Sequence, residues 1–307
     1  MANTFTNINT TKVMSEITSA LKLGLTPLNV FSLDVGSNPA EKNEVVTVPI
    51  ITARTAVSNA TNYENGNTTV VGSQVNLDTN ISSSWHITAV QASKQGTDFF
   101  VKSAVENAYA VAHAAQLKAL NLIVRASYGT STEKVLATGA DCDSDAVFDI
   151  RNTCMNTLKW RPSQNPSLVL SGDYYAGLGK DPAVKDLSAS GAGTAQSGEV
   201  MRHAGFKVYE NGVLASASTA YGATEYVRGF ACLPQSMAIA IRPPASLGSG
   251  AYEVNEVISD PDTGISMNYR QWINTSTNTL WGGIEILMGA IKHDGNALYR
   301  IVSQTSS

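Results

Sequence analysis

One stretch without glycine or proline, TDFFVKSAVENAYAVAHAAQLKALNLIVRAS (Thr97–Ser127), constrains the fold more than any other. Its apolar residues recur at helical spacing, and Thr97 or Asp98 can cap its first turn. A helix of about 30 residues would be roughly 45 Å long, more than twice the usual length in globular proteins. Because the stretch lacks the a/d heptads of a coiled coil, we expect a long spine against which other elements pack.

The residues before this helix predict a second, amphipathic helix and a strand. Residues 11–25 carry an apolar stripe at helical spacing, and Pro27 ends the pattern. This helix is expected to form an N-terminal arm with one apolar face. The β-branched run Glu44–Ile51 is typical of a strand.

Residues 52–84 predict a long hairpin without a core of its own. The segment is polar and β-prone, and it contains the turn signal Asn65-Gly66. Its few large apolar side chains cannot offset the entropy cost of ordering some thirty residues. The hairpin is therefore expected to stay loose or to lie on another molecule, which indicates oligomerisation.

The region after the long helix mixes helices and strands. Residues 144–160 read as a helix capped by Ser144, and Pro166–Ser171 as a short buried strand before a helical turn. The end of the chain predicts a β-meander with polar turns between its strands. A buried strand in SMAIAIRPP precedes the meander strands 265–273, 280–291 and 297–302.

The stretch GEVMRHAGFKVYENGVL (198–214) gathers several charged side chains in a chain that is only 15% charged. Phe206 and Val208 alternate with Lys207, and Asn211-Gly212 is the favoured pair of a two-residue hairpin turn. We interpret the stretch as a strand and a turn whose charges lie on an exposed face, rather than as a chemical site.

The composition describes a folded, nearly neutral protein. Of the 307 residues 43% are hydrophobic, and 21 basic against 25 acidic residues give a net charge of −4. This balance lacks the basic footprint of a nucleic-acid-binding protein, so any contact with DNA is expected to be weak and non-specific. The three cysteines, an odd number, argue against a disulfide framework and favour a reducing cytoplasm. No signal peptide or membrane-spanning stretch is evident, so no membrane partner is expected.

The acidic run Asp141–Asp145 imitates the start of a calcium-binding loop. Its sixth position is Ala146 rather than glycine, and its twelfth is Asn152 rather than glutamate. We interpret the carboxylates as groups at a helix N-terminus. Nucleotide-binding, zinc-protease and serine-hydrolase motifs are missing from the sequence, so we expect no metal, no cofactor and no enzymatic activity.

A cysteine-dependent hydrolase built from Cys154 or Cys232 with His203 stays open as an alternative. Such partners meet in space rather than in sequence, so their separation along the chain does not exclude it. Against it, Cys154 falls on an apolar helix face, where a structural cysteine is the more common case.

The order of these elements resembles that of the major capsid proteins of tailed double-stranded DNA phages, the Hong Kong ninety-seven capsid fold. The segments NPSLVLSGDYYAGLGKD, GEVMRHAGFKVYENGVL and FACLPQSMAIAIRPP resemble parts of the same family, and the resemblance covers nearly the whole chain. It implies an α+β fold whose subunits assemble into an icosahedral shell around the genome.

The resemblance also implies a division of the chain and a set of contacts. The regions would be an N-arm (1–43), a P-domain strand (44–51), an extended E-loop across an adjacent subunit (52–85), the P-domain with its spine helix (86–127), an axial A-domain (128–262), and P-domain strands (263–307), the final strand being able to return to the A-domain. The candidate contacts with neighbouring subunits are Arg54, Tyr63, Glu64, Asn65, Trp85, Arg202, Lys207 and Glu210.

The expected partners follow from the same resemblance. The chain would form hexamers and pentamers of itself, together with a portal, a separate scaffolding protein because no internal scaffolding segment precedes the arm, and a decoration protein where one exists. It would assemble in the host cytoplasm and reside in the virion. Some family members crosslink an E-loop lysine to a neighbour, but no lysine lies between Thr52 and Ser93, so no covalent mesh is expected.

Two further alternatives stay open besides the hydrolase. An encapsulin-like nanocompartment has the same fold and would bind a cargo enzyme instead of DNA. An adhesin or surface-layer protein fits the Thr- and Asn-rich composition but lacks a secretion signal.

Overall fold

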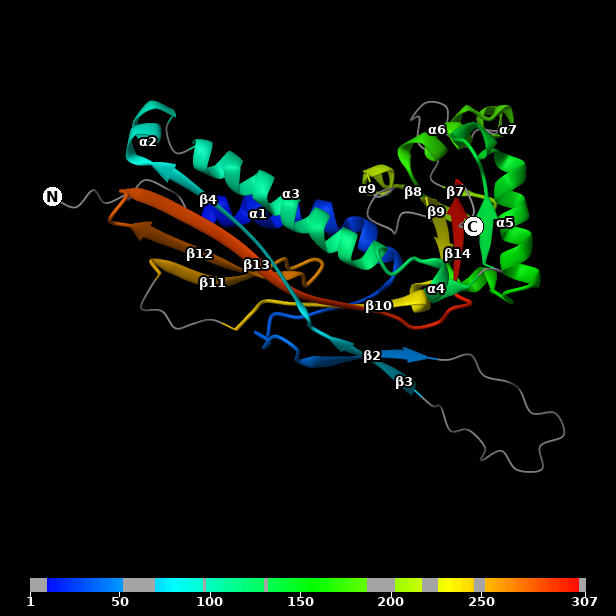
Figure 1. The fold of residues 1–307 in the computed structure, drawn as a ribbon, viewed down its shortest axis with the longest axis horizontal. Coiled ribbons are helices and arrows are strands. Elements are labelled where there is room, and N and C mark those ends of the chain that lie inside the picture. The colour runs from blue at the N-terminus through cyan, green and yellow to red at the C-terminus, as the bar shows by residue number, and fades with distance from the viewer. Residues whose placement is uncertain are drawn as a thin grey trace, which may run out of the picture.

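The computed structural model describes residues 10–51, 70–95, 98–129, 132–186, 202–216, 226–245 and 252–303. Figure 1 shows an elongated first sheet with helices along one face, a compact second sheet at one end, and a ribbon of strands beyond the opposite face of the first sheet. The protein is therefore a mixed α+β structure with two main sheets.

The first sheet has six strands, and its long strand β13 pairs with three others. Strands β11, β12 and β13 follow each other as antiparallel neighbours. The pairing of β12 with β13 confirms the predicted meander for residues 265–273 and 280–291, but the predicted third strand, 297–302, lies in the second sheet. Strand β1 is parallel to β10, whereas β10 and β4 are both antiparallel to β13. The strands are β1 (Ser32–Val35), β10 (Met237–Arg242), β13 (Thr279–Lys292), β12 (Ser266–Asn274), β11 (Val254–Ser259) and β4 (Thr79–Thr88).

Helices α1 (Thr10–Leu25) and α3 (Asp98–Leu120) cover one face of this sheet. The apolar stripe of α1 is buried against α3 in the main core, and a buried Gln116 side chain donates a hydrogen bond to the Gly24 carbonyl. Alanines on α3 and Gly24 on α1 let the two helices approach closely, since a methyl group on Gly24 would meet the Ala112 side chain. The apolar face predicted for an N-terminal arm therefore packs on the protein's own spine helix.

The spine helix is shorter than predicted. α3 ends at Leu120, and a separate turn of helix, α4 (Arg125–Tyr128), begins after Val124, whose backbone is extended with φ −111° and ψ 158°. The amides of Leu122 and Ile123 bond to carbonyls three residues back, which tightens the end of α3. Neither glycine nor proline marks this end of the helix in the sequence.

The second sheet is covered on both faces. One face packs against α5 (Ser144–Asn156), α6 (Gly172–Lys180) and α7 (Pro182–Asp186), and the other face joins the main core beside α3. Its six strands are β5 (Glu133–Val135), β14 (Leu298–Val302), β9 (Val227–Cys232), β6 (Ser167–Leu170), β8 (Phe206–Glu210) and β7 (Arg202–His203). Because both faces are covered, β6 and β14 are buried along their whole length.

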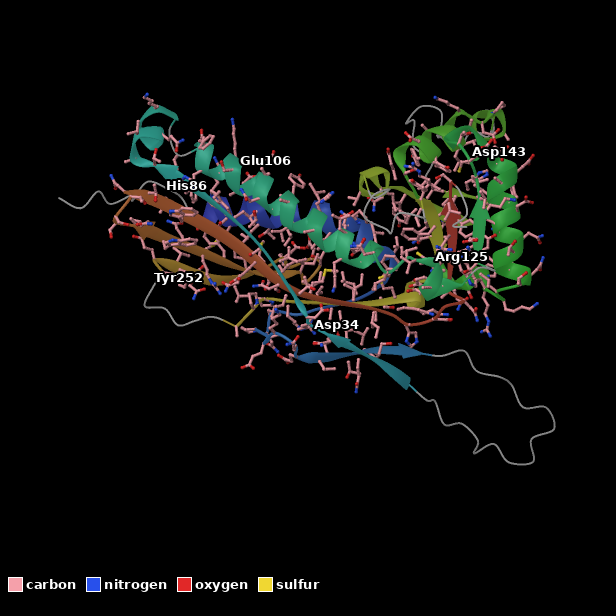
Figure 2. The ribbon with its side chains drawn as sticks, in the orientation of Figure 1. Asp34, His86, Glu106, Arg125, Asp143 and Tyr252 are labelled. Atoms are coloured by element: carbon pink, nitrogen blue, oxygen red, sulfur yellow. The ribbon has the colours of Figure 1, made fainter. Side chains whose placement is uncertain are left out.

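A buried ion pair lies inside the second sheet, and α4 contacts the same carboxylate. The Arg300 guanidinium of β14 is fully buried and pairs with the Glu133 carboxylate of β5. The Arg125 guanidinium of α4 lies 3.9 Å from the other oxygen of the same carboxylate. Figure 2 shows Arg125 at the junction between the two sheets.

The ribbon of β2 (Val45–Ile51) and β3 (Val70–Asn76) packs on the face of the first sheet away from α3. Val48, Val75 and Leu77 form a small core there with Ala238, Ala240 and Leu287, so the base of the predicted coreless hairpin does have a core. Residues 79–84, predicted as part of that hairpin, instead belong to β4 of the first sheet.

Three further expectations need correction. The predicted boundary at residue 262 does not follow the sheets, because β10 and β11 belong to the first sheet with β12 and β13. α5 is capped by Asp143, whose carboxylate accepts a hydrogen bond from the Ala146 amide at 2.8 Å, rather than by Ser144. Asn211-Gly212 is not a hairpin turn, since the Asn211 side chain caps α9 (Gly212–Ser216) by accepting from the Val213 amide.

Candidate functional site

The cysteines considered as nucleophiles lie in apolar cores. Burial raises the pKa of the Cys154 thiol to about 12, and it raises the pKa of the fully buried Cys232 thiol further. The two residues pack in different cores. A protonated, buried thiol is a poor nucleophile, so these cysteines do not support the hydrolase alternative.

His203 contacts a serine instead of a cysteine. Its Nε2 atom lies 2.9 Å from the Ser144 Oγ atom at the start of α5, and the Phe148 ring lies edge-on to the imidazole. Burial lowers the pKa of His203, while the nearby Asp181 carboxylate and the hydrogen bond with Ser144 act in the opposite direction. The Asp181 carboxylate itself is held by the amides of Ser144 and Ala183, which lower its pKa. These groups fasten the β7–β8 hairpin to α5 and α7.

Carboxylates of the acidic run Asp141–Asp145 accept hydrogen bonds from backbone amides. The Asp141 carboxylate accepts hydrogen bonds from the Thr138 amide and hydroxyl, and Asp143 caps α5. Within the described residues, no group of three or more His, Cys, Asp or Glu side chains is arranged to hold a metal ion.

Arg202, Lys207 and Glu210 lie at the edge of the second sheet. Arg202 and Lys207 are opposite each other in the β7–β8 pair, with Arg202 exposed and Lys207 half-buried. The turn between them is Ala204-Gly205, whose φ angles of 46° and 82° match a two-residue hairpin turn. The Glu210 carboxylate is exposed beside the N-terminus of α6 at Gly172. Their contacts with neighbouring chains stay a prediction.

Trp85 is a core residue. Its side chain is only 5% exposed, and its indole packs against the rings of Phe100 and Tyr269 at 5.5 and 6.3 Å. The contact with a neighbouring chain predicted for Trp85 is therefore wrong, because the inward face of β4 places this ring under α3. The other candidates in the hairpin, Arg54, Tyr63, Glu64 and Asn65, lie outside the described residues.

A row of aromatic rings, which the sequence analysis did not find, crosses the face of the first sheet opposite α3. The rings of His86, Trp281 and Trp272 belong to neighbouring strands and stack at 4.5 and 5.8 Å, and Tyr252 meets Trp272 edge-on at 6.0 Å. Figure 2 shows His86 and Tyr252 near the end of this sheet that is far from the second sheet. Register alone brings these rings together, so no local sequence signal predicts them.

A shallow hollow lies beside this row. It has a volume of about 440 Å³, and strand β13 lines it at Gly283. The Arg270 guanidinium pairs with Glu285 at its side and lies 5.3 Å from the centre of the Tyr252 ring. Its remaining lining residues are Ser82, Ser83, Ser84, Trp272 and Ile284. Hydroxyls, ring edges and a neutralised ion pair suit contact with another protein surface better than bond-making chemistry.

Within the described part of the chain, no helix combines the length and the apolar character needed to cross a membrane.

Comparison with known proteins gives structural relatives only. No family model and no curated protein sequence matches the chain. Among solved structures, the capsid of cyanophage P-SCSP1u matches at 14% identity and a TM-score of 0.56, over 89% of this chain and 86% of that one. The mature capsid of bacteriophage PhiM1 matches at 12% identity and a TM-score of 0.52, over 88% and 85%.

A third relative is a virus-like particle from Pyrococcus furiosus, with 11% identity, a TM-score of 0.51, and coverage of 95% of this chain and 98% of that one. In all three matches the likeness runs through both sheets rather than one of them, since it spans most of each chain. The protein therefore has the fold of the major capsid proteins of tailed phages, as its sequence predicted.

Proposed function

We propose that this protein is the major capsid protein of a tailed phage, a subunit that assembles with copies of itself into an icosahedral shell around double-stranded DNA. The observation that carries the proposal is the mutual coverage with the P-SCSP1u capsid chain, 89% of this chain and 86% of that one. A match of this extent describes a whole shell subunit rather than a domain shared by unrelated proteins.

The chemistry of the described residues supports a structural role. The buried thiols have raised pKa values, the acidic run caps backbone amides, and the hollow beside Gly283 is lined by hydroxyls and a closed ion pair. A shell subunit needs large self-complementary surfaces rather than a pocket with perturbed catalytic groups. We accordingly propose no enzymatic activity.

The proposed partners are further copies of the chain in hexamers and pentamers, a portal, a separate scaffolding protein and, where present, a decoration protein. Contact with packaged DNA would be non-specific, because a net charge of −4 gives no strong attraction to phosphates. The proposed location is the virion, after assembly in the host cytoplasm.

A nanocompartment shell is the second candidate, and the match to the Pyrococcus furiosus virus-like particle favours it. The two candidates share the fold and differ in their contents. Purified particles that contain DNA would support the phage capsid, whereas particles that contain a single protein cargo would support the nanocompartment.

Electron microscopy of the purified protein tests the proposal directly. We expect icosahedral shells or capsomer rings, from the protein alone or after co-expression with a scaffolding protein. A stable monomer that forms no assembly under either condition would overturn the proposed function. Mature shells should also dissolve into monomers in SDS, because the segment from Thr52 to Ser93 offers no lysine for a covalent mesh.

A further inference from the structure

Strand β4 (Thr79–Thr88) is an unusually long open edge. Its ten residues pair with β13 on one side, and among the described residues no strand pairs with its other side. The remaining edge strands of the two sheets, β1, β11, β5 and β7, have six residues or fewer. An unpaired edge presents a row of amide and carbonyl groups that can pair with another chain.

β4 also lacks the devices that keep an edge strand from pairing. Its sequence TNISSSWHIT contains no Lys, Arg, Asp, Glu or Pro. Every other edge strand of the two sheets carries a charged residue. These residues are Asp34 in β1, Glu256 in β11, Glu133 and Lys134 in β5, and Arg202 in β7. Charged residues and proline are the usual protection of sheet edges, so among the edge strands of the two main sheets β4 alone lacks this protection.

The strand is held in a pairing conformation by its inward face. Ile81, Trp85 and Ile87 are buried under α3, and the Ser83 hydroxyl bonds to the Asn107 side chain of α3. Pairing therefore needs little further ordering of the strand, which is the main cost of strand addition.

We propose that β4 pairs with β4 of a second copy of this chain, antiparallel and around a two-fold axis. Such an axis places each residue opposite the residue at the same distance on the other side of the axis, so a charge near the middle of the strand lies close to its own copy. Uncharged β4 meets no such repulsion, whereas Glu256 in β11 and Arg202 in β7 would oppose it.

The geometry of this pairing suits a shell. A two-fold axis that relates antiparallel neighbours is perpendicular to the sheet, so the two first sheets continue as one layer with both α3 helices on the same side. Two registers give the largest overlap of the strands: Ser84 opposite Ser84 of the other copy, or Ser82 opposite Ser84. This inference builds on the proposed function, since it assigns a contact between two subunits of the shell.

Single-cysteine variants test the pairing. Opposite residues of antiparallel strands have Cβ atoms about 5 Å apart, which a disulfide can bridge with small adjustments. The three native cysteines are buried and give little background. Under mild oxidation we expect Ser84→Cys to form a disulfide-linked dimer in the first register, and Ser82→Cys mixed with Ser84→Cys to do so in the second. Glu256→Cys, on the exposed edge β11, should stay monomeric on the gel.

A charge variant gives an independent readout. Ser84→Lys should leave the melting temperature close to that of the wild type, because Ser84 is exposed, but should abolish assembly beyond capsomers. Ser84→Thr should assemble as the wild type does. The inference is overturned if neither cysteine combination crosslinks, if crosslinks join β4 only to another segment or protein, or if Ser84→Lys forms normal shells.

These results separate the two proposals. If the wild type forms shells but the cysteine variants give no β4–β4 crosslink, the pairing is refuted and the capsid function stays in place. If the cysteine variants crosslink but the wild type never forms shells, the pairing is supported and the capsid function is refuted.

Discussion

His203 lies where the β7–β8 hairpin meets the first turn of α5, and its burial favours the neutral ring. Because its pKa is lowered in the folded state, the unfolded chain binds more protons once the pH falls below about 6.5, and the stability falls with it. We expect the melting temperature of the wild type to drop more between about pH 7.5 and about pH 5.5 than that of His203→Gln.

His113→Gln provides the control for this measurement, because His113 is exposed on α3. Its melting temperature should follow the wild-type pH dependence. A His203→Gln protein that keeps the full wild-type slope would show that other groups carry the acid sensitivity.

The roles of His203 and the cysteines could not be predicted from residue types. The sequence allowed Cys154 or Cys232 with His203 as a hydrolytic pair, and burial and spatial partners decide against it. Burial and spatial partners are both set by contacts between residues far apart in the chain, such as Ser144 and His203, which are 59 positions apart. Trp85 shows the same limit. A contact with a neighbouring chain was predicted for it, but the register of β4 places its side chain in the core.

Helix α6 packs directly on the short 3-10 helix Gly139–Asp141, and two glycines allow the contact. A methyl group on Gly177 would overlap the carbonyl oxygen of Gly139. We expect Gly177→Ala to lower the free energy of unfolding by about 1–3 kcal/mol, as overpacked cores do. The midpoint of urea denaturation measures this change.

Gly212→Ala is the matched control, because a methyl group on Gly212 meets nothing within 4 Å. Its denaturation midpoint should equal or exceed that of the wild type. Equal midpoints for Gly177→Ala and the wild type would mean that α6 moves away from the 3-10 helix without cost.

At the level of elements, the predictions succeeded where the signal is local. The strands ending at Asn274, Lys292 and Val302 lie within a residue or two of their predicted ends, because alternation and polar turns mark them. The hairpin turn predicted at Asn211-Gly212 is wrong, because the Asn side chain that favours such a turn can also cap a helix, as it does here for α9. The sheet to which β10 belongs follows from its pairing with β1 and β13, which no local pattern reveals.

In the whole molecule, the ribbon β2–β3 keeps its own attachment to the first sheet. Val48, Val75 and Leu77 pack in a small core against the first sheet, and the Ser73 hydroxyl lies 2.5 Å from His293 Nδ1. Replacing residues 54–67 by Asn-Gly should therefore leave the melting temperature within a few degrees of the wild type, since no described core residue is removed. Under the proposed function it should prevent the formation of shells in electron micrographs.

Alanine variants of Tyr63 and Glu64 are the finer comparison for that deletion, because they keep the length of the segment. Normal shells from the deleted protein would contradict a role of residues 54–67 in contact with an adjacent copy.

Strand β14 comes later in the chain than every other strand of both sheets, yet it lies between β5 and β9. Arg300 follows Glu133 by 167 positions in the chain. During synthesis, β5 therefore cannot pair fully with β14 until residue 302 has left the ribosome. A chain truncated before β14 therefore lacks the strand that joins β5 to β9, and its second sheet is incomplete.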